Sequence, residues 1–441
     1  MSAVTDAPIA RGARDSTRRH ERSPRAAFIS TYRPRQCGIA TFCEDLVQAA
    51  GDGGSSDAFV IAMDRPGSGL RYESPVALVV DECEERGYRA AGDLIDSSSI
   101  DVVSVQHEFG IFGGPECPHL ALLLASIRKP VITTLHTVVP QPDSLIRERI
   151  VELTELSRRV VVMNPLAIEI LDHDYGVDTG KVSFIHHGVP VPSAESREEA
   201  KARLGLTGRM VLSTFGLVGR GKGLEHAIGA MPEVIGRHPE AIYLIVGETH
   251  PLVRQSEQES YREELLALVE RLGLVDHVVF VNRYVTKDEI LRYLTASDVY
   301  LTPYPNVNQI TSGTLAYAAA AGAAIVSTPY LYARFLLADG RGLLVEARSE
   351  SAIARSVTRL LDDPGLRSTI AKRAADYGRR MYWPIVGAAY VSLFREVMQP
   401  VEAARTTGWP APRSLQIARR NAYDGRAGRP GPFAQPFAAA D

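Results

Sequence analysis

The stretch Asn308–Tyr330, NQITSGTLAYAAAAGAAIVSTPY, predicts a turn, a helix and a buried strand in succession. Thr311–Thr314 are small and polar, and they precede the apolar helical run Leu315–Ala321. Gly322 ends that run, and Ala323–Thr328 has the composition of an interior strand. Hydroxyl side chains and a glycine at a helix start leave backbone N–H groups beside the positive end of the helix dipole, which favours phosphate binding. An ordinary Ser/Thr N-cap on a small-residue core helix explains the same residues.

Length and composition limit the class of protein. A chain of 441 residues predicts two domains rather than one. The hydrophobic fraction of 45% and the charged fraction of 23% are ordinary for globular proteins. The formal net charge of −3 argues against a nucleic-acid-binding surface as the main function.

Cysteine spacing and hydropathy bear on the compartment. Cys37, Cys43, Cys83 and Cys117 form no C-x-x-C pair and are expected to be reduced thiols rather than a disulfide frame or a zinc site. No run of about 18 apolar residues occurs, so no membrane span is expected. The arginine-rich N-terminus lacks the apolar region of a secretory signal, although it allows weak contact with an acidic lipid surface. We therefore expect a cytoplasmic protein.

Short apolar runs alternate with helical patterns twice along the chain. Residues 26–190 hold the first set, residues 191–205 form a polar linker, and residues 206–375 hold the second set. Apolar runs of about four to eight residues between helices are typical of parallel sheets covered on both faces. The sequence thus predicts an α/β fold with two Rossmann-like, doubly wound domains facing each other across a cleft. Ligands bind such sheets beyond the carboxyl ends of the strands.

The two ends of the chain have a different composition. Residues 1–25 and 401–441 lack periodicity and are expected to be mostly disordered. Residues 376–400 continue a helical pattern that is interrupted at Trp383-Pro384, where a proline kinks or breaks a helix. A kinked helix there would cross back to the first domain. Two consecutive surface helices are the alternative.

A glycine-rich turn follows the first strand of the second domain. It reads FGLVGRGKGLEHAI, Phe215–Ile228, and its spacing is neither that of a P-loop nor that of a dinucleotide-binding loop. Glycines let a backbone approach an anion, and Lys222, helped by Arg220, can neutralise a diphosphate leaving group. A solvated basic turn is the alternative. The candidate diphosphate-binding residues in this domain are Gly219, Gly221, Thr311, Ser312, Gly313 and Thr314.

Loops after strands of the first domain carry further polar candidates. TYRPRQCGIATF contains Gly38, VQHEFGIFGG contains His107 and Glu108, and TLHT contains His136. His136 can contact a sugar hydroxyl or a carbonyl, although a lone histidine is more often a structural hydrogen-bonding residue. The stretch QHE lacks a third metal ligand at a defined spacing, so no metal is expected. In the second domain, His250 follows a strand and is a further candidate in the cleft.

Together these stretches resemble a GT-B glycosyltransferase of family 4, a group of retaining enzymes that use nucleotide-sugar donors. The resemblance covers about residues 27–395 and is carried by CGIATF, TLHT, HHGVP, FGLVGRGKG, VGETHP, DVYLTPYP and the opening stretch. It implies that Gly38 and Lys222 lie on the donor diphosphate, with Arg220 a looser match, and that His136 touches the donor sugar. It further implies transfer of a hexose to an unidentified sugar or small-molecule acceptor, with no cofactor beyond the nucleotide sugar.

One departure from the family concerns a pair of glutamates that usually contact the donor sugar and the ribose. Gln309 and Tyr317 stand at those places here, and both can form hydrogen bonds although neither carries a charge. The departure indicates an atypical subgroup. It leaves two alternatives to a hexosyltransferase, namely a non-catalytic nucleotide-sugar-binding protein and a GT-B nucleotide-sugar epimerase.

Overall fold

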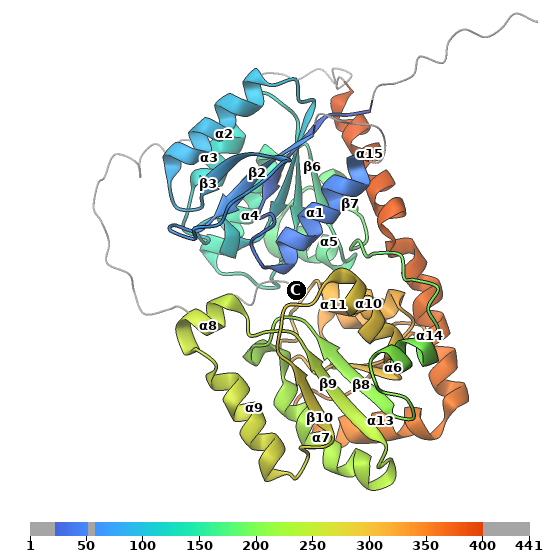
Figure 1. The fold of residues 1–441 in the computed structure, drawn as a ribbon. Coiled ribbons are helices and arrows are strands. Elements are labelled where there is room, and N and C mark those ends of the chain that lie inside the picture. Colours follow the sequence, from blue (N-terminus) through green and yellow to red (C-terminus); the bar gives the residue numbers. More distant parts are fainter. Residues whose placement is uncertain (1–22, 52–57, 400–441) are drawn as a thin grey trace, which may run out of the picture.

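Two parallel β-sheets with helices packed around them form the body of the protein (Figure 1). The computed structural model describes residues 23–51 and 58–399. The tails expected to be disordered therefore lie almost entirely outside the described residues. The expected α/β architecture with two Rossmann-like units is confirmed, because every strand pairing in both sheets is parallel and helices separate the strands.

The first sheet has the strand order β3-β2-β1-β4-β5-β6-β7. Its central strand β1 is buried along its whole length, as its apolar sequence AAFIS requires. The order reverses direction between β1 and β4, and such a switch point opens a crevice at the carboxyl ends of the strands. The strands are β1 (Ala26–Ser30), β2 (Phe59–Asp64), β3 (Val76–Asp81), β4 (Val102–His107), β5 (Val131–Leu135), β6 (Arg159–Val162) and β7 (Val182–Phe184). The helices are α1 (Gly38–Gly51), α2 (Glu85–Ser97), α3 (His119–Ser126), α4 (Ser144–Leu156) and α5 (Leu166–Ile170).

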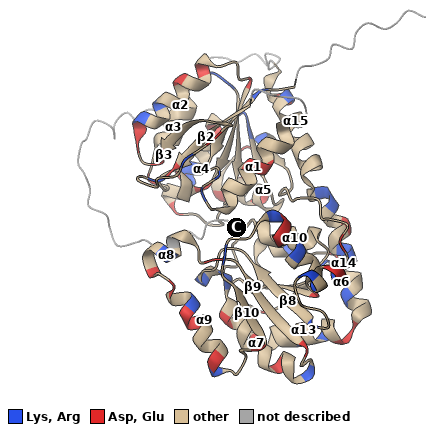
Figure 2. Cartoon of the chain, in the orientation of Figure 1, with Lys and Arg blue, Asp and Glu red and all other residues tan. Residues whose placement is uncertain are grey.

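The second sheet has the strand order β10-β9-β8-β11-β12-β13, with its switch point between β8 and β11. Figure 2 shows β8, β9 and β10 without charged residues, whereas Lys, Arg, Asp and Glu lie on the surrounding helices. The strands are β8 (Met210–Phe215), β9 (Ala241–Val246), β10 (Val278–Val281), β11 (Val299–Thr302), β12 (Ala324–Ser327) and β13 (Leu343–Leu344). The helices are α6 (Arg197–Arg203), α7 (Leu224–Arg237), α8 (Pro251–Glu257), α9 (Ser260–Arg271), α10 (Lys287–Ala296), α11 (Gly313–Ala320), α12 (Leu331–Leu336) and α13 (Glu350–Asp362).

The last two helices run along different domains (Figure 1). Helix α14 (Pro364–Gly378) packs against α11 and β12 of the second sheet. A short 3₁₀ turn, Arg379–Met381, follows it, and α15 (Trp383–Met398) returns to the first domain. Pro384 lies in the first turn of α15, where a missing N–H costs no hydrogen bond.

Helix α15 is part of the hydrophobic core of the first domain. Its Tyr390 and Phe394 are buried together with Phe28 of β1, and the rings of Phe28 and Phe394 are 6.2 Å apart. Gly387 allows a close approach to α1, because a Cβ atom there would lie 2.7 Å from the Cβ of Ala49. The C-terminal helix therefore ties the second domain to the first.

Helix α1 begins at Gly38, because Cys37 caps it: the Cys37 carbonyl accepts from the Thr41 N–H at 3.2 Å, and its thiol lies 3.3 Å from the Ala40 nitrogen. Within residues 23–51 and 58–399, no helix is both long and apolar enough to cross a membrane.

Candidate active site

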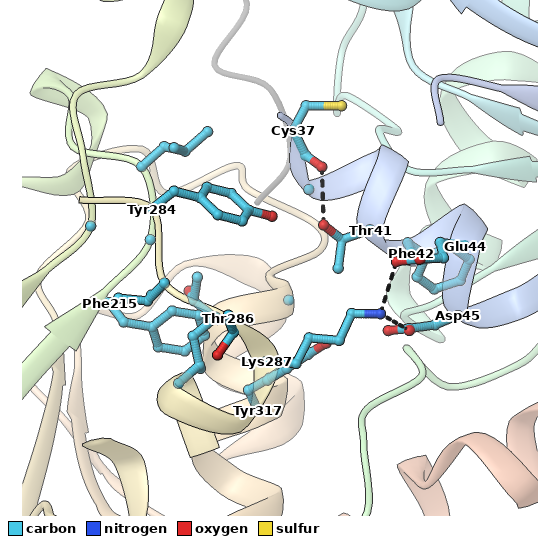
Figure 3. A pocket seen from close by; sticks show the side chains of 18 of the residues that line it. Cys37, Thr41, Phe42, Glu44, Asp45, Phe215, Tyr284, Thr286, Lys287 and Tyr317 are labelled. Carbon is cyan, nitrogen blue, oxygen red and sulfur yellow. Dashed lines mark hydrogen bonds and ion pairs between the residues drawn. The ribbon is translucent and has the colours of Figure 1, made fainter. Parts of the chain in front are cut away.

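A cavity of about 390 Å³ lies between the two domains at the carboxyl ends of both sheets. We call it the central cavity. The first domain lines it with the loop after β1 and the first turns of α1, and the second domain with the loops after β8, β9 and β10 and the start of α11. Figure 3 shows Tyr284 and Phe215 on the second-domain side, across from Thr41 and Phe42 on α1. Gly38, the first residue of α1, also lines it.

Bare backbone forms one wall of the central cavity. Gly216 and Gly247 follow β8 and β9, and their φ angles of +125° and +139° are accessible mainly to glycine. A Cβ atom on Gly247 would lie 2.1 Å from the carbonyl oxygen of Gly216, so a side chain has no room there. The two strand ends therefore meet closely and leave space for a ligand against the main chain.

Lys222 lies directly behind this glycine wall. It ends the 3₁₀ turn Arg220–Lys222, and its side chain is only 8% exposed. Its Nζ donates to the Tyr304 hydroxyl at 3.3 Å and lies 3.7 Å from the position of a Cβ on Gly216. Burial lowers the pKa of Lys222 to about 7, because the charged ammonium loses its hydration. An anion at Gly216 would favour the protonated form of this lysine.

The start of α11 borders the same wall. The Ser312 side chain caps the helix by accepting from the Leu315 N–H at 3.3 Å. The Thr314 hydroxyl lies 2.8 Å from that of Tyr304, and its methyl group lies 3.1 Å from a Cβ position on Gly216. Gly313 and Thr314 line the central cavity, while Thr311 and Ser312 are buried beneath it. The Ser312 N-cap expected from the sequence is therefore confirmed, and the capped helix presents its N-terminus to the cavity. Phosphate binding at this helix start stays a prediction.

Gln309 and Tyr317 occupy different surroundings. The Gln309 side chain donates to the Thr311 carbonyl at 3.0 Å, and the residue is not among those that line the central cavity. Tyr317 does line it and packs against Phe215, with ring centroids 5.9 Å apart. Burial and then the nearby charge of Asp45 raise the pKa of Tyr317. The tyrosine thus stays neutral near Asp45 of the first domain.

Arg220 points away from the central cavity. Its guanidinium binds Glu257 at 3.0 Å and Glu264 at 2.7 Å, and it lies over the ring of Tyr261. These partners belong to the α8–α9 segment. The neighbouring Gly219 and Gly221 are also not among the cavity-lining residues. The structure brings together Lys222, Gly313 and Thr314 of the expected diphosphate group, but not Arg220, Gly219 and Gly221.

The first-domain histidines are buried beside the cavity. His136 lies 3.1 Å from the Gln106 Oε1, and its ring contacts Phe42, which lines the cavity, at 4.9 Å between centroids. The ring of His107 stacks on Phe112. Burial lowers the pKa of both histidines to about 3, so both are neutral at physiological pH. Among the described residues, no group of three or more His, Cys, Asp or Glu side chains is placed to hold a metal ion.

A second cavity of about 420 Å³, which we call the side cavity, adjoins the central one. The loops after β1, β2 and β4 line it from the first domain, and His250 and Pro251 line it from the second. Glu108 lies in its wall, where it accepts from the Phe109 N–H at 3.0 Å and from the Thr137 hydroxyl. Burial raises the pKa of Glu108 to about 7 and lowers that of His250 to about 4.

Sequence reasoning missed the interdomain contacts of the central cavity. Lys287 lies at the start of α10, where it pairs with Glu44 and Asp45 of α1 (Figure 3). The Asp45 carboxylate also accepts from the Trp383 Nε1–H at 3.0 Å. Thr286 and Glu289 form a capping box at the start of α10, and this pattern can be recognised in the sequence. It does not predict a partner on α1.

Comparison with known proteins shows what this chain is similar to. Residues 196–377 match the family described as Glycosyl transferases group 1. The chain is 26% identical over 327 residues to the phosphatidyl-myo-inositol mannosyltransferase of Mycolicibacterium smegmatis, a match that covers 70% of this chain and 75% of the relative. It is 28% identical over 240 residues to the 2-deoxystreptamine glucosyltransferase of Streptomyces kanamyceticus, covering 52% of this chain and 56% of that protein.

A solved structure shows the same fold. The Anabaena Alr3699/HepE protein in complex with UDP and glucose superposes with a TM-score of 0.67 at 15% identity, over 84% of this chain and all of the other. The GT-B arrangement expected from the sequence is therefore confirmed. Residues 196–377 are thus similar to group 1 glycosyl transferases, and the chain is a glycosyltransferase with the GT-B fold.

Proposed function

We propose that this enzyme transfers a hexose from a nucleoside diphosphate sugar to a sugar or small-molecule acceptor, with retention of configuration, as an atypical member of family 4. The diphosphate lies in the central cavity against Gly216, and the acceptor enters from the first-domain side. Gly38 approaches the donor from α1. No metal or further cofactor takes part in this proposal. The cytoplasmic location expected from the sequence stays a prediction.

The proposal rests on one observation: Lys222 and the N-terminus of α11 both lie next to Gly216. The Lys222 Nζ and the Thr314 methyl lie 3.7 Å and 3.1 Å from the same Cβ position on Gly216. A cation, first-turn N–H groups and an open main-chain wall are the elements that bind a diphosphate. Gly216, Gly313 and Thr314 line the central cavity, and Lys222 lies directly behind Gly216.

The chemistry follows from this placement. When the bond between the sugar C1 and the diphosphate oxygen breaks, the oxygen keeps the electron pair and negative charge builds up on the leaving group. Protonated Lys222 and the N–H groups of Gly313 and Thr314 stabilise that charge in a site closed off from water. In a retaining front-face transfer, the acceptor oxygen bonds to C1 on the face that the diphosphate leaves, and the departing oxygen accepts the proton of the acceptor hydroxyl.

The hexose is supported by what related proteins do. The two relatives named above are a mannosyltransferase and a glucosyltransferase, and the solved neighbour holds UDP and glucose. In this proposal Tyr317 replaces the usual ribose-binding glutamate. Gln309 would reach the sugar only after its bond to the Thr311 carbonyl is exchanged for one to a sugar hydroxyl.

Release of nucleoside diphosphate tests the proposal. Wild type, Lys222→Ala and the control Lys372→Ala are incubated with UDP-, GDP- and ADP-sugars, with and without a mixed acceptor pool. Lys372 is 76% exposed and pairs with Asp376 on α14, so its loss controls for the general effect of removing a lysine. We expect acceptor-dependent release that falls about 100-fold in Lys222→Ala and is unchanged in Lys372→Ala.

Other results would contradict parts of the proposal. Conversion of the donor to an isomer without acceptor would identify an epimerase. Binding of a donor without any release would identify a nucleotide-sugar-binding protein. Near-normal turnover in Lys222→Ala would remove the leaving-group role from that lysine, whatever the donor.

A further inference from the structure

The side cavity shares one lining residue with the central cavity, where the donor is proposed to bind. Cys37 lines both cavities, and it immediately precedes Gly38 at the start of α1. His250 of the second domain reaches the side cavity, and its pKa is lowered by burial and then by the charges of Lys222 and Arg65. A ligand in the side cavity therefore lies next to the place where the donor diphosphate is proposed to bind.

Arg65 brings a cation into the wall of the side cavity. It follows β2 directly and is half-buried. Within residues 23–51 and 58–399, no carboxylate lies at ion-pair distance from its guanidinium, whereas its neighbour Arg35 pairs with Glu82 at 2.9 Å. Burial and then the charge of Arg35 lower the pKa of Arg65, whereas the charges of Glu82 and Asp64 act in the opposite direction.

The acidic groups around Arg65 are engaged elsewhere. The Asp64 carboxylate accepts from the Arg65 backbone N–H at 2.8 Å and from the Ser68 hydroxyl. Glu108 is hydrogen-bonded to Thr137 and to a backbone N–H, and it is close to half-protonated at neutral pH. The carboxylates of this wall therefore leave the Arg65 guanidinium available for a ligand.

We propose that the side cavity selects an acceptor that carries an anionic group, a phosphate monoester or a carboxylate, and that Arg65 binds this group. The inference rests on the proposed transferase function and adds the class of acceptor to it. An arginine offers paired N–H donors that match both oxyanions, and a half-buried site strengthens the bond. The acceptor hydroxyl would then point past Cys37 toward the donor sugar.

Matched acceptors and variants test the inference. Transfer from the donor identified above is measured to glucose, glucose 6-phosphate and glucuronate, and to glycerol, glycerol 3-phosphate and glycerate. The proteins are wild type, Arg65→Ala, Arg65→Lys and the control Arg89→Ala. Arg89 is 78% exposed on α2, where it pairs with Glu85. Binding of inorganic phosphate and of the same six compounds is measured by calorimetry on the full chain without donor.

We expect wild type to prefer the anionic member of at least one set. Arg65→Ala should raise the KM of that compound about 10- to 100-fold, the size of a lost hydrogen-bonded charge contact, with Arg65→Lys recovering part of it. Preference for the phosphate over the carboxylate, or the reverse, shows which anionic group the natural acceptor carries. Arg89→Ala should behave as wild type.

The failures of the two proposals are distinguishable. Transfer that favours the neutral members, or equal KM values in wild type and Arg65→Ala, overturns the anionic acceptor and leaves the transferase intact. Arg65-dependent binding of an anionic compound, without transfer from any donor, supports the side-cavity site and overturns the proposed reaction. Similar binding of phosphate to wild type and Arg65→Ala also overturns the side-cavity site.

Discussion

Lys287 of the second domain bridges to Asp45 and Glu44 on α1 of the first domain, and its Nζ lies 3.0 Å from the Glu44 Oε2. Asp45 is buried and also accepts from the Trp383 Nε1–H at 3.0 Å. Burial raises the pKa of Asp45, and the charge of Lys287 opposes that rise. The contact holds the two walls of the central cavity together at the edge nearest α10 (Figure 3).

Removing this lysine should loosen the closed arrangement. In Lys287→Ala, Asp45 keeps its bond to Trp383 but loses its cation, so the interdomain contact weakens. Because Lys287 is 30% exposed, we expect a loss of about 1–2 kcal/mol rather than the larger value for a fully buried pair. Thermal unfolding measures the loss, and small-angle scattering measures an increased radius of gyration. Equal radii in Lys287→Ala and Lys372→Ala would show that the bridge does not hold the domains closed.

Much of the fold is readable from local patterns, whereas the site depends on distant partners. The buried strands β1, β4, β8 and β12 stand out as short apolar runs, and their parallel arrangement places the loops that follow them at one edge. Lys287 and Glu44 are 243 residues apart in the chain, so no local pattern predicts their contact.

The direction of a side chain is equally hard to read from sequence. Arg220 and Lys222 lie in one turn, yet Arg220 binds Glu257 and Glu264, while Lys222 turns inward to Tyr304. Two residues of a 3₁₀ turn project in different directions, and only the positions of α8, α9 and Tyr304 decide which one turns inward behind the cavity wall.

Asp45 explains why a tyrosine suits position 317. The neutral Tyr317 lies near Asp45, whose charge helps to raise its pKa, whereas a glutamate there would place a second carboxylate beside Asp45. We expect Tyr317→Glu to lower stability by about 2 kcal/mol or more, and Tyr317→Phe, which adds no charge, to lower it by less than about 1 kcal/mol. The double variant Asp45→Asn/Tyr317→Glu should recover most of the loss, because the amide can donate to the new carboxylate. Additive losses in the double variant, measured by denaturant unfolding, would show that repulsion between the two side chains is not the cause.

The lowered pKa of Lys222 predicts that the protein takes up a proton when the donor binds. The pKa of this buried lysine is lowered to about 7, so at pH 8 most of the free enzyme carries it neutral. A bound diphosphate diester does not titrate near this pH and should recharge the lysine, giving uptake approaching about one proton at pH 8 and much less at pH 6. Calorimetry of nucleotide-sugar binding in buffers of different ionisation enthalpy measures it.

Two variants test which residue takes up that proton. Lys222→Met should abolish the buffer dependence of the binding enthalpy. His250→Asn should retain it, because the pKa of His250 is lowered to about 4 and this ring would need a far larger shift to gain a proton at pH 8. Buffer-independent enthalpies in the wild type would mean that Lys222 does not change its charge on binding.

The raised pKa of Glu108 predicts that the stability difference between Glu108→Gln and wild type depends on pH. Burial raises its pKa from 4.5 to about 7, so the folded protein binds more protons than the unfolded chain between those values. The stability contributed by this group is therefore complete below pH 4.5 and is lost as the pH rises through 7. In Glu108→Gln, the amide oxygen can still accept from the Phe109 N–H, and the Thr137 hydroxyl can rotate to accept from the new NH₂ group. The free energy of unfolding of the variant relative to wild type should rise by about 1–3 kcal/mol from pH 5 to pH 8. Wild type and variant share all other titrating groups, whose contributions cancel in this difference. A difference that stays constant from pH 5 to pH 8 would contradict the prediction. It would mean that Glu108 is already ionised and that its site does not oppose the charge.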